Sequence, residues 1–494
     1  MSFIIQAAAS GGTITAQAST AMTGNKPVIV NANGTVDEVG LVVPAGFTQS
    51  ATATTNPTAN SNAGNCNAIS VGSNTFVIVG RQNTTLYPMI VAGTVSGNAF
   101  TWGTPAVIES LACGLQMGIA YDSVNQKVVV GYSTSGSGQR AVVATISGTT
   151  VSLGTIATAD ATGSTSPVTV VYDSTNQKIA YFYGVPGGGS QNYARVGTVS
   201  GTSISFGSST QINTVGSVTY TRTRGTFDSA NGKVILVGAE TSTRISSTVC
   251  TISGTSISVG TTQQIDTGNF QGTYGPLFDV CYHAAQSRVI VSYAVIGANN
   301  NFAVAGQVSG TSISYGSSVT VDTTQQYESI SCCYDSVDQA ILFLCTSASS
   351  FGKVNSAVLS GSTITLNYAT AQSYGSAGAP SVLMYNASSN RTYIARTGNP
   401  TSSSFINVPY YVTLAAAFST NLTSENFIGF SDGAYAAGQT ATIEIIGAVN
   451  DGQSGLTPGQ SYYVQLNGTL GLSPASPSVF AGTAFATTKI IVKG

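Results

Sequence analysis

The chain repeats itself at intervals of 51 to 55 residues along most of its length. The clearest copies of the motif Tyr-Asp-Ser-x-Asn-Gln-Lys start at Tyr121 and Tyr172. Looser copies start at Phe227, Tyr282, Tyr334 and Tyr385, and a degenerate copy starts near Ile69. Such repetition limits the fold strongly, because each unit must bury its apolar surface against its neighbours. We count seven repeats.

A second motif follows the first within each repeat. It reads Thr-Val-Ser-Gly-Thr-Ser-Ile-Ser-Phe-Gly at residues 198–207, and its Ser-Gly step predicts a two-residue hairpin turn. The glycine of this turn recurs at Gly97, Gly148, Gly201, Gly254, Gly310 and Gly361.

Each repeat is predicted to form four antiparallel strands. An apolar stretch runs into Tyr-Asp, and Asp-Ser-x-Asn then makes a tight turn because short polar side chains bond their own backbone. A β-branched strand follows, as at residues 127–132, and a loop of variable length leads to a third strand, as at residues 140–146. The fourth strand, as at residues 202–206, alternates Ser or Thr with apolar residues at period two.

Repeats of about 50 residues with four strands each are typical of a β-propeller. We therefore predict an all-β fold, a seven-bladed β-propeller of four-stranded antiparallel blades over residues 61–420. Radial closure leaves few free strand edges, which protects so β-rich a chain from aggregation. A β-solenoid is the structural alternative, although its coils are usually shorter than this repeat.

Two small β modules flank the repeats. Residues 1–60 form the predicted N-terminal module and linker, and residues 421–494 form the C-terminal β domain. The segments 28–36 and 462–470 share the pattern of a hairpin around Asn-Gly. This similarity suggests that the two modules pack together as one unit.

Charged residues make up only 7% of the chain, whereas an ordinary soluble domain has about 25%. The 16 basic residues, spread over 494 positions, do not supply the extended basic face that a nucleic-acid partner requires. No apolar run approaches the length of about 18 to 20 residues that a membrane-spanning helix needs. We therefore expect neither a nucleic-acid partner nor membrane insertion.

Few residues are suited to metal or cofactor chemistry. His283 is the one histidine, which removes most histidine-based metal and acid–base sites. The repeated Asp offers a single carboxylate per turn, so turn capping is favoured over a calcium loop. The 7 cysteines include no CxxC pair and are expected to be buried thiols, with a disulfide framework as the alternative. We expect no metal and no cofactor.

The sequence holds no complete catalytic constellation. The Gly-x-Ser-x-Gly match at residues 429–433 has no histidine after it, so we interpret it as a surface turn. Sialidase-type propellers need an arginine cluster, and the arginines here do not fall at one equivalent position of the repeat. Paired carboxylates for glycoside hydrolysis stay an open alternative. We predict no catalytic residues and no enzyme.

One end of the predicted propeller is regular and the other is variable. The first and third turns of each blade are short, whereas the loops between the second and third strands differ in length and content. Variable loops on a rigid scaffold usually carry binding chemistry, and sequence drift is the alternative. The candidate ligand-binding residues on these loops are Arg81, Tyr87 and Tyr193.

Residues 121–130 and 196–207 resemble repeats of virion proteins from marine tailed phages, notably cyanophages. The C-terminal stretch, above all residues 455–464 and 486–492, resembles a module at the end of such proteins. This resemblance implies a structural, tail-fibre-like protein of the virion that is assembled in the host cytoplasm. It brings no catalytic residues with it.

On this resemblance we expect a non-enzymatic virion protein whose propeller contacts the host surface through a glycan. The flanking modules would anchor it to other virion proteins or form a homo-oligomer, and a trimer is expected because phage fibres are commonly trimers. A capsid decoration or head-fibre protein without a receptor role is one alternative. A carbohydrate-active propeller enzyme is the other.

Overall fold

A computed structural model describes most of the chain. The described residues are 12–42, 67–72, 74–82, 85–96, 99–114, 116–162, 166–185, 191–212, 220–240, 244–268, 270, 277–295, 300–323, 329–337, 339–346, 351–366, 372–376, 381–388, 391–396, 419–466, 468–475 and 477–493.

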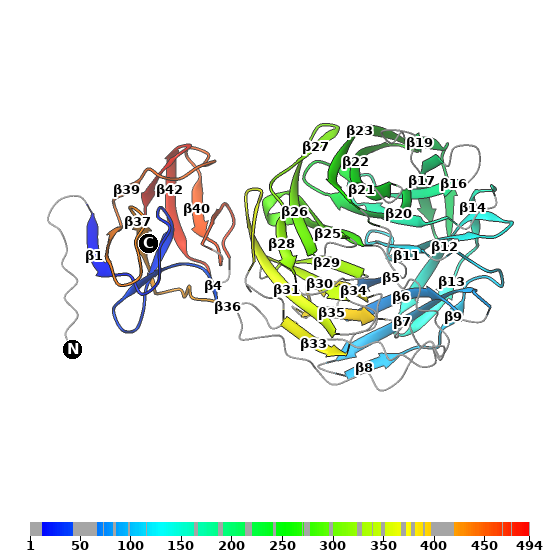
Figure 1. The fold of residues 1–494 in the computed structure, drawn as a ribbon, viewed down its shortest axis with the longest axis horizontal. Helices are drawn as coiled ribbons and strands as arrows, with labels where there is room; N and C mark the ends of the chain where they lie inside the picture. The colour runs from blue at the N-terminus through cyan, green and yellow to red at the C-terminus, as the bar shows by residue number, and fades with distance from the viewer. Residues whose placement is uncertain are drawn as a thin grey trace. The chain divides into compact units, whose positions relative to one another are not determined.

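The chain forms two compact units, one of residues 46–416 and one that joins residues 1–45 to residues 417–494. Both are built from β-strands (Figure 1), as the sequence predicts. The one helix among the described residues is a 3₁₀ turn of three residues, η1 (Ala284–Gln286). No helix in the described ranges is long and apolar enough to cross a membrane.

Six sheets of the larger unit follow one plan, in which four strands pair antiparallel in chain order. The first sheet has β5 (Asn67–Val71), β6 (Thr75–Arg81), β7 (Pro88–Ser96) and β8 (Ala99–Trp102). The second has β10 (Gly118–Asp122), β11 (Lys127–Thr134), β12 (Gly138–Ser147) and β13 (Thr150–Leu153). The third has β15 (Val168–Asp173), β16 (Lys178–Val185), β17 (Gln191–Ser200) and β18 (Ser203–Phe206).

The next three sheets repeat this order. The fourth has β20 (Tyr220–Asp228), β21 (Lys233–Glu240), β22 (Arg244–Ser253) and β23 (Ser256–Thr267). The fifth has β24 (Phe278–His283), β25 (Arg288–Val295), β26 (Asn300–Ser309) and β27 (Ser312–Tyr315). The sixth has β29 (Ser329–Asp335), β30 (Ala340–Thr346), β31 (Phe351–Ser360) and β32 (Thr363–Leu366).

A short fifth strand, which the sequence pattern did not predict, pairs with the third strand of five sheets. These strands are β9 (Ala106–Val107), β14 (Ala157–Asp160), β19 (Thr210–Ile212), β28 (Val319–Asp322) and β33 (Gln372–Ser376). In the fourth sheet the long strand β23 bends at two register shifts and covers the same length of β22. The segment that leads from one sheet to the next therefore first adds a strand to the sheet that it leaves.

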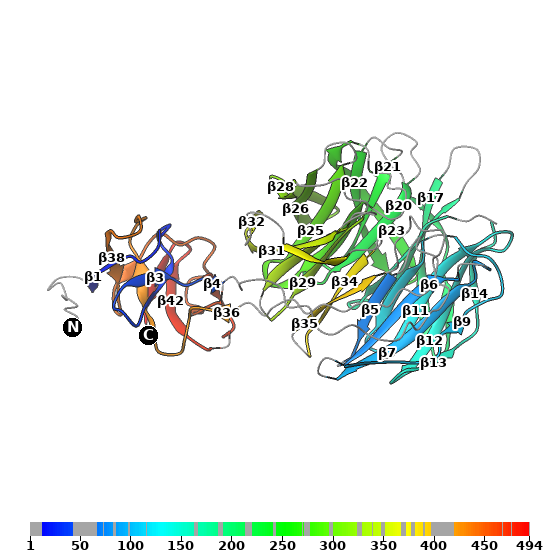
Figure 2. The same cartoon turned by 60° about the horizontal axis from the view of Figure 1, so that its bottom comes forward.

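The sheets close into a ring around their first strands (Figures 1 and 2). Each first strand contacts the next in the order β5, β10, β15, β20, β24, β29 and β34, and β34 (Ser381–Asn386) contacts β5 again. This is the arrangement of a β-propeller. The described part of the seventh sheet has only β34 and β35 (Arg391–Arg396), so the full count of seven four-stranded blades stays a prediction.

Apolar side chains fill the space between every pair of neighbouring sheets. Second strands such as β11 are buried on both faces, which explains their uninterrupted β-branched sequences. The last cluster joins Phe76 and Ile78 of the first sheet to Met384 and Tyr393 of the seventh. The hydrophobic core therefore runs around the ring without a break.

Where a first strand ends in the Asp of the repeat, this Asp caps the turn that follows, as the sequence predicts. Asp122 accepts hydrogen bonds from the backbone N–H of Val124 (3.2 Å) and of Asn125 (3.0 Å), and from the Asn125 amide (2.8 Å). Asp173 and Asp228 make the same three bonds. The second strand of these sheets thus starts from a uniform turn, and the hairpin glycines such as Gly148 precede the fourth strand at the same end. This end of the ring is called the turn end.

The smaller unit interleaves the two ends of the chain. One sheet has the order β1 (Thr13–Gln17), β38 (Thr440–Glu444), β37 (Phe427–Ser431), β2 (Pro27–Val30) and β3 (Val36–Glu38). Another has the order β39 (Val449–Asn450), β43 (Lys489–Val492), β42 (Phe480–Ala486), β40 (Ser461–Val464) and β41 (Leu470–Gly471). The pair β4 (Leu41–Val42) and β36 (Ser419–Thr420) completes the unit.

The similar segments 28–36 and 462–470 form matching hairpins in this unit. Val30 pairs with Val36, and Val464 pairs with Leu470 at the same spacing. The sequence-based division into residues 1–60, 61–420 and 421–494 separates the two ends, whereas the structure gives them one shared sheet. Backbone pairing of β1 and β2 with β38 and β37 is the reason.

Candidate functional site

The first strands place one equivalent residue of every repeat beside the ring axis. This position lies four residues before the end of each first strand, toward the end of the ring where first strands begin. We call this end the loop end, because the variable loops also lie there. The seven residues are Asn67, Gly118, Thr169, Arg224, Asp279, Ser331 and Val382.

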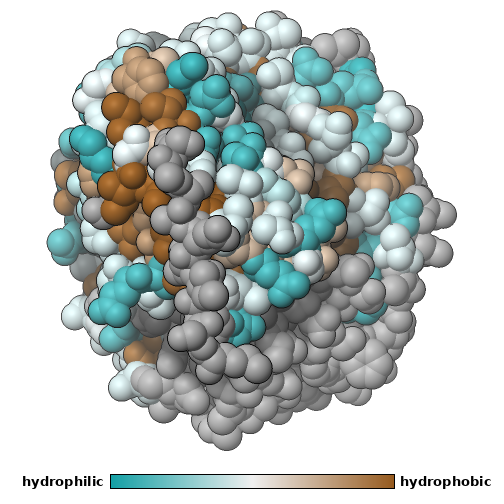
Figure 3. Space-filling model, turned by 90° about the vertical axis from the view of Figure 1, so that its left-hand side faces the viewer, coloured by the Kyte–Doolittle hydropathy of each residue, from teal (hydrophilic) through white to brown (hydrophobic). Residues whose placement is uncertain are grey.

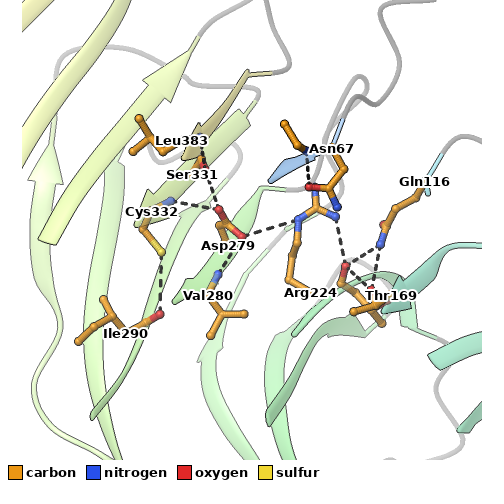
Figure 4. Close-up of polar contacts among 12 residues, drawn as sticks. Asn67, Gln116, Thr169, Arg224, Asp279, Val280, Ile290, Ser331, Cys332 and Leu383 are labelled. Atoms are coloured by element: carbon orange, nitrogen blue, oxygen red, sulfur yellow. Dashed lines mark hydrogen bonds and ion pairs between the residues drawn. The ribbon is translucent and has the colours of Figure 1, made fainter. Parts of the chain in front are cut away.

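Five of these seven residues are polar, although first strands are mainly apolar. Together with residues beside them they make a network of polar contacts (Figure 4). We call this network the axial cluster. It consists of Gln116, Thr169, Thr223, Arg224, Asp279 and Ser331. Arg222 precedes Thr223 on β20, and Asn67 donates to the carbonyl of Met117, which follows Gln116 in the chain.

Asp279 is the best-satisfied member of the axial cluster. Its carboxylate accepts hydrogen bonds from the Ser331 hydroxyl (2.7 Å) and from the backbone N–H groups of Cys332 (3.1 Å) and Val280 (2.9 Å). Arg224 approaches it less closely, with Nε 3.7 Å from Oδ1. Burial raises the pKa of Asp279, and the positive charge of Arg224 opposes that rise.

Two arginines stand side by side on β20. Arg222 precedes Arg224 by two residues, so both side chains project from the same face of the strand. Burial lowers the pKa of Arg222 to about 10, and the like charge of Arg224 contributes to this shift. The site therefore concentrates positive charge where solvent is scarce.

The described first strands carry few other charges. The acidic residues Asp122, Asp173, Asp228 and Asp335 end their strands at the turn end. Arg222, Arg224 and Asp279 are the charged side chains of these strands toward the loop end. Within the described first strands, the loop-end side of the axis therefore holds two cations and one anion.

Gln116 links three sheets on the other side of Arg224 (Figure 4). Its Nε2 donates to the carbonyl of Thr223 (2.6 Å) and to the hydroxyl of Thr169 (3.3 Å), and the two threonine hydroxyls are 2.7 Å apart. Its Oε1 has no hydrogen-bond partner among the described residues, although Gln116 is only 4% exposed. An unsatisfied buried acceptor is costly, so the bonds of its Nε2 must hold Gln116 in place.

The structure places Arg81 and Tyr87 at the loop end of the first sheet. Arg81 ends β6, where its guanidinium donates to the carbonyl of Cys113 (3.1 Å), and burial lowers its pKa. Tyr87 is half-buried directly before β7, and its carbonyl accepts a hydrogen bond from Gln82 (2.9 Å). Arg81 and Tyr87 thus lie at the two ends of the connection between β6 and β7. The guanidinium of Arg81 is used in a hydrogen bond to the connection that leads to the next sheet.

Tyr193 lies apart from that pair. It belongs to β17 of the third sheet and stacks on Tyr183, with ring centroids 5.8 Å apart. The second sheet stands between Tyr193 and the residues of the first sheet. The structure therefore does not gather Arg81, Tyr87 and Tyr193 into one site.

A buried Tyr–Glu pair does occur near the outer part of the second sheet. The Tyr132 hydroxyl donates to Glu109 (2.9 Å), and Arg140 forms an ion pair with the same carboxylate (2.7 Å). Tyr132 is fully buried, and burial raises its pKa far above the usual range. Corresponding acid–base pairs recur as Asp160 with Arg195 and Asp322 with Lys353, which indicates a structural element of the repeat.

Metal and thiol chemistry can be assessed for the described residues. They contain no group of three or more His, Cys, Asp or Glu side chains placed to hold a metal ion. The cysteines Cys113, Cys250, Cys281, Cys332, Cys333 and Cys345 are free thiols, as expected. The remaining one, Cys66, lies outside the described residues.

The axial cluster was missed at the level of sequence. The sequence analysis assigned binding residues to the variable loops, whereas the residues of the axial cluster lie on or beside the first strands. Its signal was the charge on otherwise apolar first strands, namely Arg222, Arg224 and Asp279.

Comparison with known proteins adds weak similarities. No protein-family model and no curated protein matches the chain. The NanB sialidase of Streptococcus pneumoniae is similar at 12% identity and a TM-score of 0.45, over 76% of this chain and 71% of that one. A six-bladed lectin of Aleuria aurantia is similar at 13% identity and a TM-score of 0.40, over 64% and 97%. The SapL1 lectin has 11% identity and a TM-score of 0.40, over 64% and 99%. At such scores we infer neither ligand nor activity from them.

Proposed function

We propose that the ring is a seven-bladed β-propeller with four-stranded blades. Seven first strands contact one another in a closed order, and seven apolar clusters fill the spaces between sheets. The seventh blade would be completed by chain beyond β35 that lies outside the described residues.

We further propose that the chain is a non-enzymatic, tail-fibre-like structural protein of a phage virion. The observation that carries this proposal is the insertion of the ring between two paired strands. Val42 of β4 pairs with Ser419 of β36, so the whole ring leaves and re-enters the small unit at one place. Such an insertion leaves the small unit closed on itself and so free to anchor the chain, which is what an attachment protein needs. The resemblance of the repeats to phage virion proteins supports the same proposal.

The ring contacts the host surface, through a glycan, at its loop end. Variable connections and the axial cluster lie at this end, whereas the turn end is uniform. Loop variability on a fixed scaffold is the usual way in which one fold serves different ligands. The low charge of the chain suits a neutral or weakly charged polysaccharide, because few ion pairs compete for its surface.

The small unit joins the chain to other virion proteins or to further copies of itself. Among its described residues, large hydrophobic side chains are exposed at Ile446, Val449, Leu472 and Phe485. On the face drawn in Figure 3, hydrophobic side chains gather in groups between polar ones. A homotrimer is the expected state.

The oligomeric state can be measured directly. Multi-angle light scattering of the full chain should give three times the mass of one chain, and Phe485→Ser should lower it. Val124→Ser removes an exposed apolar side chain of the ring (56% exposed) and serves as the control. A monomer at micromolar concentration would contradict the trimer.

Immunogold labelling of intact particles with antibody against the ring tests the virion role. Label at the tail or baseplate supports the attachment role. Label over the capsid would favour a capsid decoration or head-fibre protein without a receptor role. Absence of label from all particles would overturn the virion proposal and return attention to a carbohydrate-active enzyme.

A further inference from the structure

We propose that Cys281 and Cys332 form a site of oxidative modification, at which hydrogen peroxide converts two thiols into a disulfide that links the fifth sheet to the sixth. Both cysteines are free thiols in this structure, so the site is seen in its reduced form. The modification goes beyond the proposed attachment role and does not depend on it. It concerns how the ring responds when the chain meets an oxidising medium.

The repeat places two positions of neighbouring first strands against each other. One lies two residues before the end of a first strand, and the other lies three residues before the end of the next first strand. In the third and fourth sheets these positions hold Val171 and Gly225, and a Cβ added to Gly225 would lie 2.6 Å from Cγ2 of Val171. A disulfide needs Cβ atoms about 3.5–4.5 Å apart, so the two positions are close enough for one. In the fifth and sixth sheets they hold Cys281 and Cys332.

Two contacts place Cys332 against Cys281. The backbone N–H of Cys332 donates to Asp279 (3.1 Å), which lies two residues before Cys281 and therefore on the same face of β24. The Cys332 thiol donates weakly, over 3.9 Å, to the carbonyl of Ile290 (Figure 4), which is paired with Cys281 across β24 and β25. Both cysteines also belong to the apolar cluster between the fifth and sixth sheets. Cys332 is therefore held between two neighbours of Cys281.

The two thiols interact with each other but differ in exposure. A hydrogen bond between them is the largest cause of the raised pKa of Cys281, and burial adds to the rise. Cys332 is 4% exposed, whereas Cys281 is partly exposed. Cys281 is therefore the thiol that a small oxidant reaches first. Because the raised pKa leaves little thiolate at neutral pH, the reaction is slow, and burial excludes bulky thiol reagents from the pair.

The chemistry balances with hydrogen peroxide as the oxidant. The thiolate of Cys281 attacks one peroxide oxygen, so that an S–O bond forms, the O–O bond breaks and the departing hydroxide takes up the thiol proton to become water. The sulfur of Cys332 then attacks the sulfenic acid at Cys281. The S–S bond forms, the S–O bond breaks, and a second water leaves with the proton of the Cys332 thiol. The two thiols lose two electrons in all, and these reduce one peroxide to two waters.

The test exposes the reduced full chain, carrying Cys66→Ser, to hydrogen peroxide and counts its thiols by alkylation after unfolding. We expect two of the six described thiols to be lost. A peptide map made without reductant should show Cys281 joined to Cys332. Thermal unfolding of the oxidised chain should occur several degrees above that of the reduced chain, because the cross-link constrains the unfolded state. A reductant should restore both the thiols and the lower unfolding temperature.

Two variants remove one thiol each with a residue that the repeat itself uses. Cys332→Val introduces the residue found at the equivalent position of the third sheet, Val170. Cys281→Ala introduces the residue found at the equivalent position of the second sheet, Ala120. Neither variant should form a cross-link or unfold at a higher temperature after exposure to peroxide, and thermal unfolding of the reduced variants shows that they are folded.

Cys333→Ala is the matched control. Cys333 follows Cys332 in the chain, but its side chain belongs to the apolar cluster that the sixth sheet shares with the seventh. This variant should therefore form the cross-link as the parent chain does. An unchanged thiol count, a peptide map without the Cys281–Cys332 link, or loss of the link in Cys333→Ala while that variant stays folded would overturn the proposal.

Discussion

Val42 and Ser419 are paired partners in the ladder of β4 and β36. This pair brings the two ends of the ring-forming segment together within the small unit. The pairing makes the small unit complete without the ring, since its apolar clusters contain only residues of the two terminal segments. The ring is therefore an insertion into an already closed structure.

Excision of the ring should leave a folded small unit. A chain in which residues 12–42 are joined to residues 419–493 by a short Gly/Ser linker keeps β4 beside β36 and retains both apolar clusters. We expect a β-type circular dichroism spectrum and a cooperative thermal transition. Phe430→Ala, which empties a fully buried position, should cost about 3–5 kcal/mol and abolish that transition. A disordered excised chain would contradict the insertion.

Glycines at the end of the fourth strands should be essential for sheet-to-sheet contact. A Cβ at Gly154 would overlap the carbonyl oxygen of Thr202 in the next sheet. Gly154→Ala should therefore destabilise the protein by about 1–3 kcal/mol through overpacking. Gly80→Ala is the control, because a Cβ there has open space, and its effect should stay within about 0.5 kcal/mol. Urea unfolding of the two variants makes the comparison.

His283 should make the stability of the protein depend on pH. It is 1% exposed, its Nδ1 accepts a hydrogen bond from the Gln286 N–H, and burial lowers its pKa to about 4. Between pH 4 and 6.5 the unfolded histidine binds a proton that the folded one does not. The free energy of unfolding should therefore fall as the pH falls through this window, by up to about 3 kcal/mol.

His283→Asn isolates this contribution. The equivalent position of the seventh sheet is Asn386, which is also buried, so the replacement suits the repeat. Denaturant unfolding at pH 7 and at pH 4.5 should show a smaller loss of stability in the variant than in the wild type. Equal losses would mean that His283 does not resist protonation.

The described thiols should be inert in the folded protein. Burial raises the pKa of Cys113 and of Cys250 to about 12, so little thiolate exists at pH 8. With Cys66→Ser in place, Ellman's reagent should react slowly with the native chain and rapidly with six thiols after unfolding. Rapid reaction of the native variant would show an accessible thiolate.

The sequence and the structure point to different candidate binding residues. The sequence assigned the variable loops to one end of the ring, and Arg81 and Tyr87 lie at that end. The residues of the axial cluster escaped notice because equivalent positions such as Arg224 and Asp279 are 55 residues apart in the chain. Only the contact between β20 and β24 brings them within 3.7 Å.

The repeat, the four main strands of six sheets and their turns were determined by sequence alone, because they depend on local chemistry. The Asp122 turn closes through bonds to residues two and three positions later, and glycines such as Gly148 lie in the predicted hairpin turns, where they adopt a positive φ. The tertiary structure decided two further matters. It joined the chain ends in one sheet and gathered the axial cluster, since both depend on closing a ring whose partners are distant in sequence.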